Sequence, residues 1–406
     1  MGDFYQNGII TTLHDLKQRP LEHMEDELRQ FSQTRPMGLI LPSLFSELEG
    51  DALANIVNEL SKVDYLNEIV IGLDRATEEE YRYALKFFEP LKQNFKVLWN
   101  DGPRLRAIDE KLRNEGLAPT EPGKGRNVWY CMGYTLASGK AESIALHDCD
   151  IVTYDRSLLA RLLYPVANPN FNYEFCKGYY ARVASGKIHG RVSRLLVTPL
   201  IRALKRTIGH NDYLDFIDSF RYPLAGEFSF RADVMTDIRI PSDWGLEVGV
   251  LSEMNRNYAN NRLCQADIAD VYDHKHQELS PEDAAKGLSK MSIDISKALF
   301  RKLATNGIVF NSETFRSIKA TYFRIALDFV ETYYNDARMN GLKLDVHSEE
   351  KAVELFAKNI LAAGQSFLDN PMEKPFVPSW NRVTSAIPDV LEQIHTAVDQ
   401  DMEEYS

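Results

Sequence analysis

The chain has 406 residues, 44% of them hydrophobic, which suffices for a catalytic domain with a smaller attached unit. Its 47 basic and 59 acidic side chains give a formal net charge of -12, which disfavours nucleic acid and anionic lipid as partners. Because no apolar run reaches the roughly 18 residues of a membrane span and the four cysteines lack paired spacing, we expect a cytoplasmic protein whose thiols are buried (Cys131, Cys149, Cys176, Cys264).

Short apolar runs and helical periodicity alternate through the first part of the chain. The predicted strands are residues 38–44, 67–73, 95–99 and 143–147, and the predicted helices include residues 51–62 and 78–92. Continuous apolar strands are typical of a mainly parallel sheet with helices on both faces, so we expect an α/β fold. We assign residues 1–280 to a catalytic domain, with roughly the first 35 residues as an extension.

After residue 281 the pattern becomes helical up to residue 406. The predicted helices are residues 282–305, 312–338, 347–369 and 380–403. Their apolar residues recur at helical spacing, so we expect this region to pack on the catalytic domain or on a second subunit, and we expect a homodimer. The acidic end, residues 399–406, is predicted to be a solvated tail.

Two carboxylates follow the last predicted strand of the α/β region, in the segment Asp148-Cys149-Asp150. Successive strand residues face opposite ways, so the first and third residues can share one cation with a diphosphate. Hard oxygen ligands favour Mg²⁺ or Mn²⁺. A surface turn is the alternative interpretation of this short pattern.

Upstream, residues 121–127 combine turn-forming glycines with Lys124 and Arg126, just before a predicted helix at 129–138. Backbone amides, a helix N-terminus and Lys124 could together hold a phosphate or orient a sugar nucleotide. A plain solvated loop is the alternative. The segment is not a Walker loop, because its glycine spacing differs and no Lys-Ser/Thr pair is present.

Positive charge gathers against the acidic trend at residues 187–194. Arg191 follows Gly190, and Ser193 adds a hydroxyl, so this segment could bind a carboxylate or phosphate through forked hydrogen bonds. Residues 266–277 alternate like a strand and end in His274 and His276, which would share a face. The imidazole of His274 could complete the coordination of a metal held by Asp150.

Two acids stand beside glycines after apolar residues, Glu227 and Glu247. They could accept hydrogen bonds from sugar hydroxyls, or they could cap a following helix.

Taken in this order, the segments resemble those of the glucosyl-3-phosphoglycerate synthase family, which are retaining glycosyltransferases of the GT-A fold. The resemblance covers about residues 35 to 280. It rests on six short motifs: Pro42-Ser43-Leu44 with Glu47, Gly123-Lys124-Gly125, Asp148-Cys149-Asp150, Gly190-Arg191-Val192-Ser193 with Pro199-Leu200 after it, Pro223-Leu224-Ala225-Gly226-Glu227, and Gly245-Leu246-Glu247-Val248-Gly249, followed by His274.

The resemblance implies transfer of glucose from UDP-glucose to 3-phosphoglycerate with retention, giving glucosyl-3-phosphoglycerate, a precursor of compatible solutes. It implies a divalent cation, Mg²⁺ or Mn²⁺, on Asp150 and His274, and catalytic roles for Asp150, Glu227 and Lys124, with Glu227 holding the glucose. The donor-binding residues would be Pro42, Ser43, Leu44, Glu47, Asp74, Lys124, Asp148 and Cys149. The acceptor-binding residues would be Gly190, Arg191, Val192, Ser193 and His276.

Other functions stay open at this point. Phe45 and Ala225 depart from the family pattern, and mannosyl transfer or a glycerate-like acceptor fits the same residues. A sugar-1-phosphate nucleotidyltransferase also uses strand-end carboxylates, a glycine-lysine loop and Mg²⁺. A non-catalytic sensor of sugar nucleotides is the third class.

Overall fold

The computed structural model describes residues 6, 8–119, 122–242, 244–274, 287–371 and 376–406. Its centre is an eight-stranded sheet in the order β1-β10-β6-β9-β5-β2-β3-β4, and every neighbouring pair is parallel except those that involve β9. The strands are β1 Thr11–Leu13, β2 Met37–Leu44, β3 Leu66–Asp74, β4 Phe95–Trp99, β5 Ser143–Leu146, β6 Phe175–Tyr180, β9 Phe228–Arg231 and β10 Leu263–Ala269. A separate hairpin joins β7 Val183–Ala184 to β8 Lys187–Ile188.

Helices cover both faces of this sheet because its central strands are apolar on both sides. In β2, Ile40 faces one core cluster while Leu39 and Leu41 face the other, as the alternation of a strand requires. The first cluster includes α4 Pro103–Asn114, α5 Lys124–Ser138, α9 Ala232–Asp237 and α10 Leu246–Asn257. The second includes α2 Asp51–Leu60, α3 Glu78–Phe88 and α6 Arg156–Ala167. The predicted α/β fold is confirmed.

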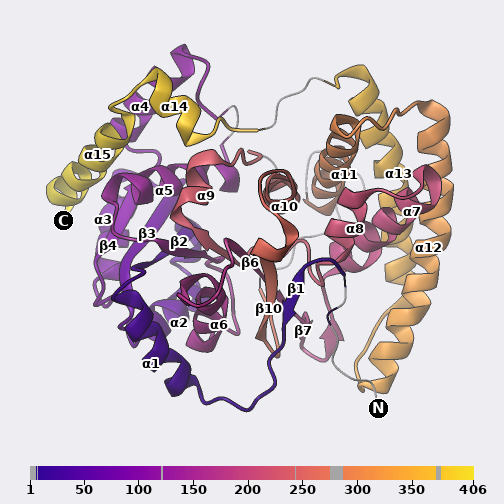
Figure 1. The fold of residues 1–406 in the computed structure, drawn as a ribbon, viewed down its shortest axis with the longest axis horizontal. Coiled ribbons are helices and arrows are strands. Elements are labelled where there is room, and N and C mark those ends of the chain that lie inside the picture. Colours follow the sequence, from indigo (N-terminus) through magenta and orange to yellow (C-terminus); the bar gives the residue numbers. More distant parts are fainter. Residues whose placement is uncertain (1–5, 7, 120–121, 243, 275–286, 372–375) are drawn as a thin grey trace.

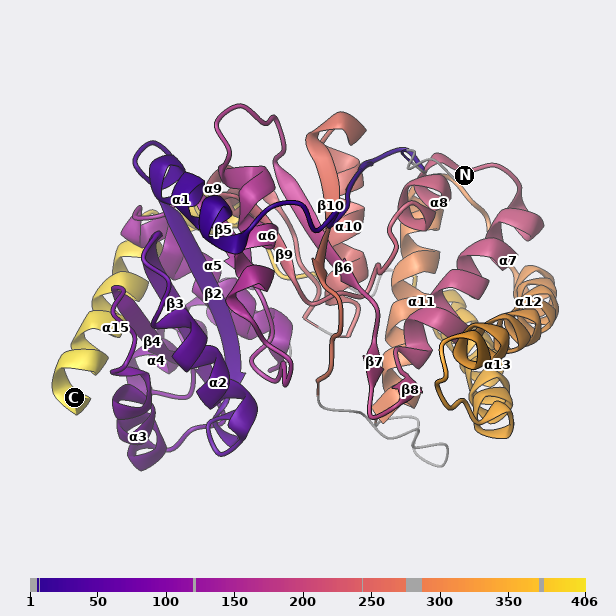
Figure 2. The same cartoon turned by 90° about the horizontal axis from the view of Figure 1, so that it is seen from below.

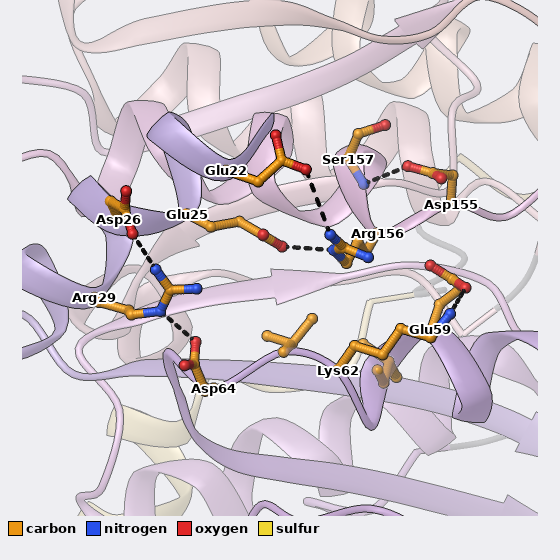
Figure 3. Close-up of polar contacts among 12 residues, drawn as sticks. Glu22, Glu25, Asp26, Arg29, Glu59, Lys62, Asp64, Asp155, Arg156 and Ser157 are labelled. Carbon is orange, nitrogen blue, oxygen red and sulfur yellow. Dashed lines mark hydrogen bonds and ion pairs between the residues drawn. The ribbon is translucent and has the colours of Figure 1, made fainter. Parts of the chain in front are cut away.

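The N-terminal extension belongs to this domain as well. Strand β1 forms one edge of the sheet beside β10, and α1 Leu21–Ser32 packs beside α6. Figure 3 shows the ion pairs that hold α1: Arg156 Nε donates to Glu25 at 2.9 Å, and Arg29 Nε donates to Asp64 at 2.7 Å. The buried carboxylate of Glu25 therefore joins α1 to the start of α6.

A second group of helices lies at one end of the sheet (Figure 1). It comprises α7 Thr198–Ile208, α8 Asp212–Asp218, α11 Gly287–Thr305, α12 Ser312–Met339 and α13 Val346–Asp369. Helix α12 packs along α7, and the hydroxyl of Tyr322 donates to the carbonyl oxygen of Leu195 at 2.7 Å. We call α11, α12 and α13 the helical unit.

The last two helices return to the far edge of the sheet, opposite the helical unit (Figures 1 and 2). They are α14 Trp380–Ala386 and α15 Val390–Tyr405, and they contact α9, α5, α4 and β4. The indole of Trp380 stacks on that of Trp129, with ring centroids 4.0 Å apart. The predicted single helix at 380–403 is thus two helices, because Pro388 follows the end of the first one.

The acidic end is not a solvated tail, which corrects the sequence prediction. Asp401 is buried and paired with Arg104, and Lys96 Nζ pairs with Asp399 at 2.6 Å. The ring of Tyr405 packs edge-on against Tyr81. Basic residues of α4 and β4 meet these acids, and this long-range charge match leaves no mark in the local sequence.

Candidate active site

The two predicted metal ligands, Asp150 and His274, come together with Asp148 at the carboxyl end of β5. One ligand atom each of Asp148, Asp150 and His274 can be chosen so that all three lie within 4.8 Å of one another. An antiparallel bridge between Ile151 and His274 places the two segments side by side. Asp150 Oδ1 is buried and accepts no hydrogen bond from the residues that the structure describes, and His274 Nδ1 lies 3.6 Å from it. Two carboxylates and an imidazole with an unsatisfied buried oxygen fit a divalent cation.

Lys124 lies beside this cluster, at the first residue of α5. Its Nζ is 2.6 Å from Asp148 Oδ1 and 3.1 Å from Glu247 Oε1. Burial opposes the charge, but the two carboxylates outweigh burial and hold the pKa of Lys124 above its ordinary value. Helix α5 begins five residues earlier than predicted, and Gly123 is its N-cap. Lys124 therefore stands at a helix N-terminus, as the sequence indicated, but within the helix.

Gly226 is required by the close packing at this point. A Cβ atom there would lie 2.4 Å from Asp148 Oδ2 and 3.0 Å from Lys124 Nζ. Only glycine leaves room for that ion pair.

The carboxylate of Glu227 is fully buried and is held by two tyrosines. Tyr180 donates to its Oε2 at 2.7 Å, and Tyr272 donates to its Oε1 at 2.5 Å. The two phenol rings stack with centroids 3.7 Å apart. Burial, reinforced by the nearby Asp148, raises the pKa of Glu227. Strand β9 begins at Phe228, so Glu227 caps no helix, whereas Glu247 lies in the first turn of α10.

The predicted donor loop begins within β2, whose last residues are Pro42, Ser43 and Leu44, and continues into the short 3-10 helix Phe45–Glu47. Glu47 Oε2 accepts from Ser43 Oγ at 3.0 Å and from the backbone N of Leu44 at 3.1 Å, which fixes the loop after Pro42. Burial, with Asp150 nearby, raises the pKa of Glu47 to about 7. At the end of the adjacent strand β3, Asp74 accepts from Asn100 at 2.7 Å, and burial raises its pKa to about 6.

A cavity of about 710 Å³ extends from Asp148 and His274 to the predicted acceptor segment. Its lining residues include Asp148, Gly226 and His274 on one side and Gly190, Arg191 and Val192 on the other. Gly190 has φ +74°, a conformation that favours glycine, and a short π-helix, Val192–Val197, follows. The segment that the sequence singled out therefore faces the candidate metal site.

Arg191 is held in place by the helical unit. Its Nε donates to Glu349 Oε1 at 2.8 Å, and its Nη2 donates to Ser348 Oγ at 3.2 Å. Glu349 is buried, and its Oε2 lies 2.8 Å from Nη1 of Arg194. One carboxylate of α13 thus pairs with two arginines of the predicted acceptor segment and orients both.

Not every predicted residue lies where the motif suggests. Ser193 is buried and is absent from the cavity lining, although its Oγ forms no hydrogen bond with a described residue. Cys149 is buried in the core between Asp148 and Asp150, on the opposite side of the chain. His276 lies outside the described residues, and the strand predicted for 266–277 is formed as β10, which ends at Ala269.

Sequence reasoning missed Tyr180, Tyr272, Glu349 and Lys177. Lys177 is buried on β6, its Nζ forms no hydrogen bond in the described chain, and burial lowers its pKa to about 8. The run Tyr179-Tyr180 was a usable signal. Strand β6 has a paired strand on each side, and polar groups on such an interior strand are unusual enough to suggest a function. Glu349 had none.

Comparison with known proteins places the chain in a family. Curated glucosyl-3-phosphoglycerate synthases of Persephonella marina and Methanococcoides burtonii are 46% and 39% identical to it, and each alignment covers 99% of both chains. These alignments extend beyond residue 281, so both relatives have sequence that corresponds to the helical unit. A scan of protein-family models finds none that matches.

Solved structures share the fold at lower identity. The glucosyl-3-phosphoglycerate synthase of Mycobacterium tuberculosis, in complex with Mn²⁺, UDP-glucose and phosphoglyceric acid, is 18% identical with a TM-score of 0.54, over 75% of this chain and 89% of that one. The mannosyl-3-phosphoglycerate synthase of Rubrobacter xylanophilus is 19% identical with a TM-score of 0.55, over 74% and 83%. This sheet and the two near-full-length relatives lead to one conclusion: the chain belongs to the glucosyl-3-phosphoglycerate synthase family of GT-A glycosyltransferases.

Proposed function

We propose that the chain transfers glucose from UDP-glucose to 3-phosphoglycerate in a reaction that depends on Mg²⁺ or Mn²⁺. The observation that carries this proposal is the single cavity that Asp148, His274 and Arg191 line together. A nucleotide diphosphate with its cation and an anionic acceptor could meet there. The two relatives bear the name of this activity, and the Mycobacterium tuberculosis structure holds Mn²⁺, UDP-glucose and phosphoglyceric acid at once.

Asp150 and His274 would hold the cation, with Asp148 beside them. The cation, when bound, offsets the negative charge of the leaving diphosphate. Lys124 would add a fixed positive charge next to the same group, since its pairing with Asp148 and Glu247 keeps it protonated at neutral pH. The donor loop at Pro42, Ser43, Leu44 and Glu47 and the carboxylate of Asp74 would bind the nucleotide.

Glu227 would hold the glucose in place. Its two oxygens are already fixed by Tyr180 and Tyr272, so its orientation is set before the sugar arrives. A carboxylate that is oriented in advance stabilises the transition state better than one that must be ordered during the reaction.

The acids that line the cavity are all engaged, which supports retention without a covalent intermediate. Among the described lining residues, Asp148 pairs with Lys124, Glu349 pairs with two arginines, and Asp345 accepts from the backbone N of Ser348. No lining carboxylate is then poised as a nucleophile. We therefore infer a front-face substitution in which the acceptor hydroxyl attacks the anomeric carbon and the leaving phosphate takes its proton.

The test is a screen of donors and acceptors. Purified protein with Mg²⁺ or Mn²⁺ is incubated with UDP-glucose or GDP-mannose, and with 3-phosphoglycerate or glycerate, while released nucleoside diphosphate is measured. UDP released only with UDP-glucose and 3-phosphoglycerate supports the proposal. Pyrophosphate released from UTP and glucose 1-phosphate would instead identify a nucleotidyltransferase, and donor binding without release of UDP would identify a sensor.

Location and assembly are also proposed. A cytoplasmic location is supported by the four free buried cysteines, of which Cys176 and Cys264 are register partners on adjacent strands without forming a disulfide. No helix in the described part of the chain is long and apolar enough to cross a membrane. The homodimer rests on sequence reasoning alone, and light scattering after size-exclusion chromatography would test it.

A further inference from the structure

The turn between α12 and α13 lies against the β7–β8 hairpin. The backbone N of Lys343 donates to the carbonyl oxygen of Gly186 at 2.8 Å, and Lys343 forms a parallel bridge with Lys187. Figure 2 shows the hairpin between the central sheet and the helical unit. A turn of the helical unit is thus joined in register to the hairpin that precedes the predicted acceptor segment.

Both sides of this junction line the cavity. The helical unit and the turn contribute Leu288, Met291, Lys343, Leu344, Asp345, Ser348 and Glu349 to its wall. The hairpin contributes Lys187 and Ile188. The cavity is therefore closed on one side by the helical unit, although the family motifs all lie before residue 281.

The charges in the cavity are not balanced at this junction. The single carboxylate of Glu349 pairs with both Arg191 and Arg194 and so offsets only part of their charge, while Asp148 pairs with Lys124. Lys187 and Lys343 are exposed, and neither has an ion-pair partner among the residues that the structure describes. The described lining holds more Lys and Arg side chains (Arg182, Lys187, Arg191, Arg194, Lys343) than carboxylates (Asp148, Asp345, Glu349), so it carries an excess of positive charge to which Lys187 and Lys343 contribute.

Two lysines in register repel one another. Like charges at paired positions of neighbouring strands destabilise the pairing, so a chain gains nothing for its fold from placing them there. An anion with about two negative charges and several oxygens removes that repulsion, and a lysine pair is a suitable binder of such a group. The phosphate of an acceptor that is itself anionic has this chemistry.

We propose that Lys343 and Lys187 bind the phosphate group of the acceptor, so that the helical unit completes the acceptor site. This inference rests on the proposed function, because it takes the cavity as the site of a phosphorylated acceptor. Glu349 supports the arrangement by orienting Arg191, which also lines the cavity.

The test uses Lys343→Ala and Lys187→Ala in the full chain, with Lys351→Ala as the matched control. Lys351 is exposed on α13 and does not line the cavity. Release of UDP is measured with each substrate varied, and the affinity for 3-phosphoglycerate and for inorganic phosphate is measured by calorimetry. We expect each of the two variants to raise the acceptor KM about tenfold, as loss of a charged hydrogen bond does, and to weaken phosphate binding similarly. The donor KM stays within about twofold, and the control matches wild type.

An acceptor KM and a phosphate affinity that equal those of wild type in both variants would overturn the inference. If wild-type protein released no UDP with 3-phosphoglycerate, the proposed function would fail, and the calorimetry with inorganic phosphate would still decide on the lysine pair. Phosphate binding that both substitutions weaken would then support an anion site without that activity. Equal binding in all four proteins would refute it.

Discussion

The substitution Asp74→Asn should make the protein more stable and a poorer binder of its donor. Asp74 is 8% exposed at the end of β3, and its Oδ1 accepts from Asn100 at 2.7 Å. An asparagine has nearly the same shape and keeps that acceptor oxygen, but it cannot ionise. The substitution therefore removes the cost of burying a negative charge.

The rise in the pKa of Asp74 from 3.8 to about 6 sets the size and the pH range of this effect. Such a rise corresponds to about 3 kcal/mol, so we expect a gain of the order of 1–3 kcal/mol. A raised carboxyl pKa means that the folded protein retains the proton longer than the unfolded chain. The wild type therefore loses stability as the pH rises from about 4 to about 6, and the gain from asparagine is complete above pH 6 and absent below pH 4.

Thermal unfolding at several pH values, combined with steady-state kinetics, tests this expectation. At pH 7.5 the variant should melt a few degrees above wild type, at about 2–4 °C per kcal/mol, and at pH 4 the two should coincide. The KM for UDP-glucose should rise while the acceptor KM is unchanged. Asp328→Asn is the control, since Asp328 is exposed and its ion pair among the described residues is with the exposed Arg324. A lower melting temperature of Asp74→Asn at pH 7.5 would refute the burial argument.

Four further substitutions probe the site. Asp150→Asn should abolish metal-dependent turnover and weaken Mn²⁺ binding in calorimetry, with His274→Ala nearly as damaging; wild-type activity of the Asp150 variant after chelation would exclude this metal site. Glu227→Gln should lower kcat at least about tenfold with little change in donor KM, because one tyrosine hydroxyl then faces an amide nitrogen. Arg191→Lys keeps the charge but loses the fork to Glu349 and Ser348, so acceptor KM should rise; a rise in donor KM would move Arg191 to the nucleotide site.

Local patterns predicted much of the fold and part of the site. The strands were readable because their apolar runs are continuous, and Asp148 and Asp150 stood out because carboxylates directly follow such a run. Helix α5 was placed too late, since its start carries two glycines that discourage a helix. Position 125 nevertheless requires glycine, because a Cβ atom there would lie 2.1 Å from the carbonyl oxygen of Pro241.

Contacts between distant segments could not be predicted. Glu349 follows Arg191 by 158 residues, and nothing near either residue indicates that they meet. The same holds for Tyr180 and Tyr272, which join at Glu227 only because β6 and β10 are neighbours in the sheet. The helical region was predicted from its periodicity, but periodicity says which face of a helix is apolar and not what that face covers.

The most direct test of the central claim is the identity of the product. The protein is incubated with UDP-glucose, 3-phosphoglycerate and Mg²⁺, and the products are analysed by mass spectrometry and NMR. The account predicts UDP and glucosyl-3-phosphoglycerate in equal amounts, with the anomeric configuration of the donor retained. An inverted anomer would contradict the front-face mechanism, and UDP-glucose recovered unchanged with 3-phosphoglycerate would contradict the assigned activity itself.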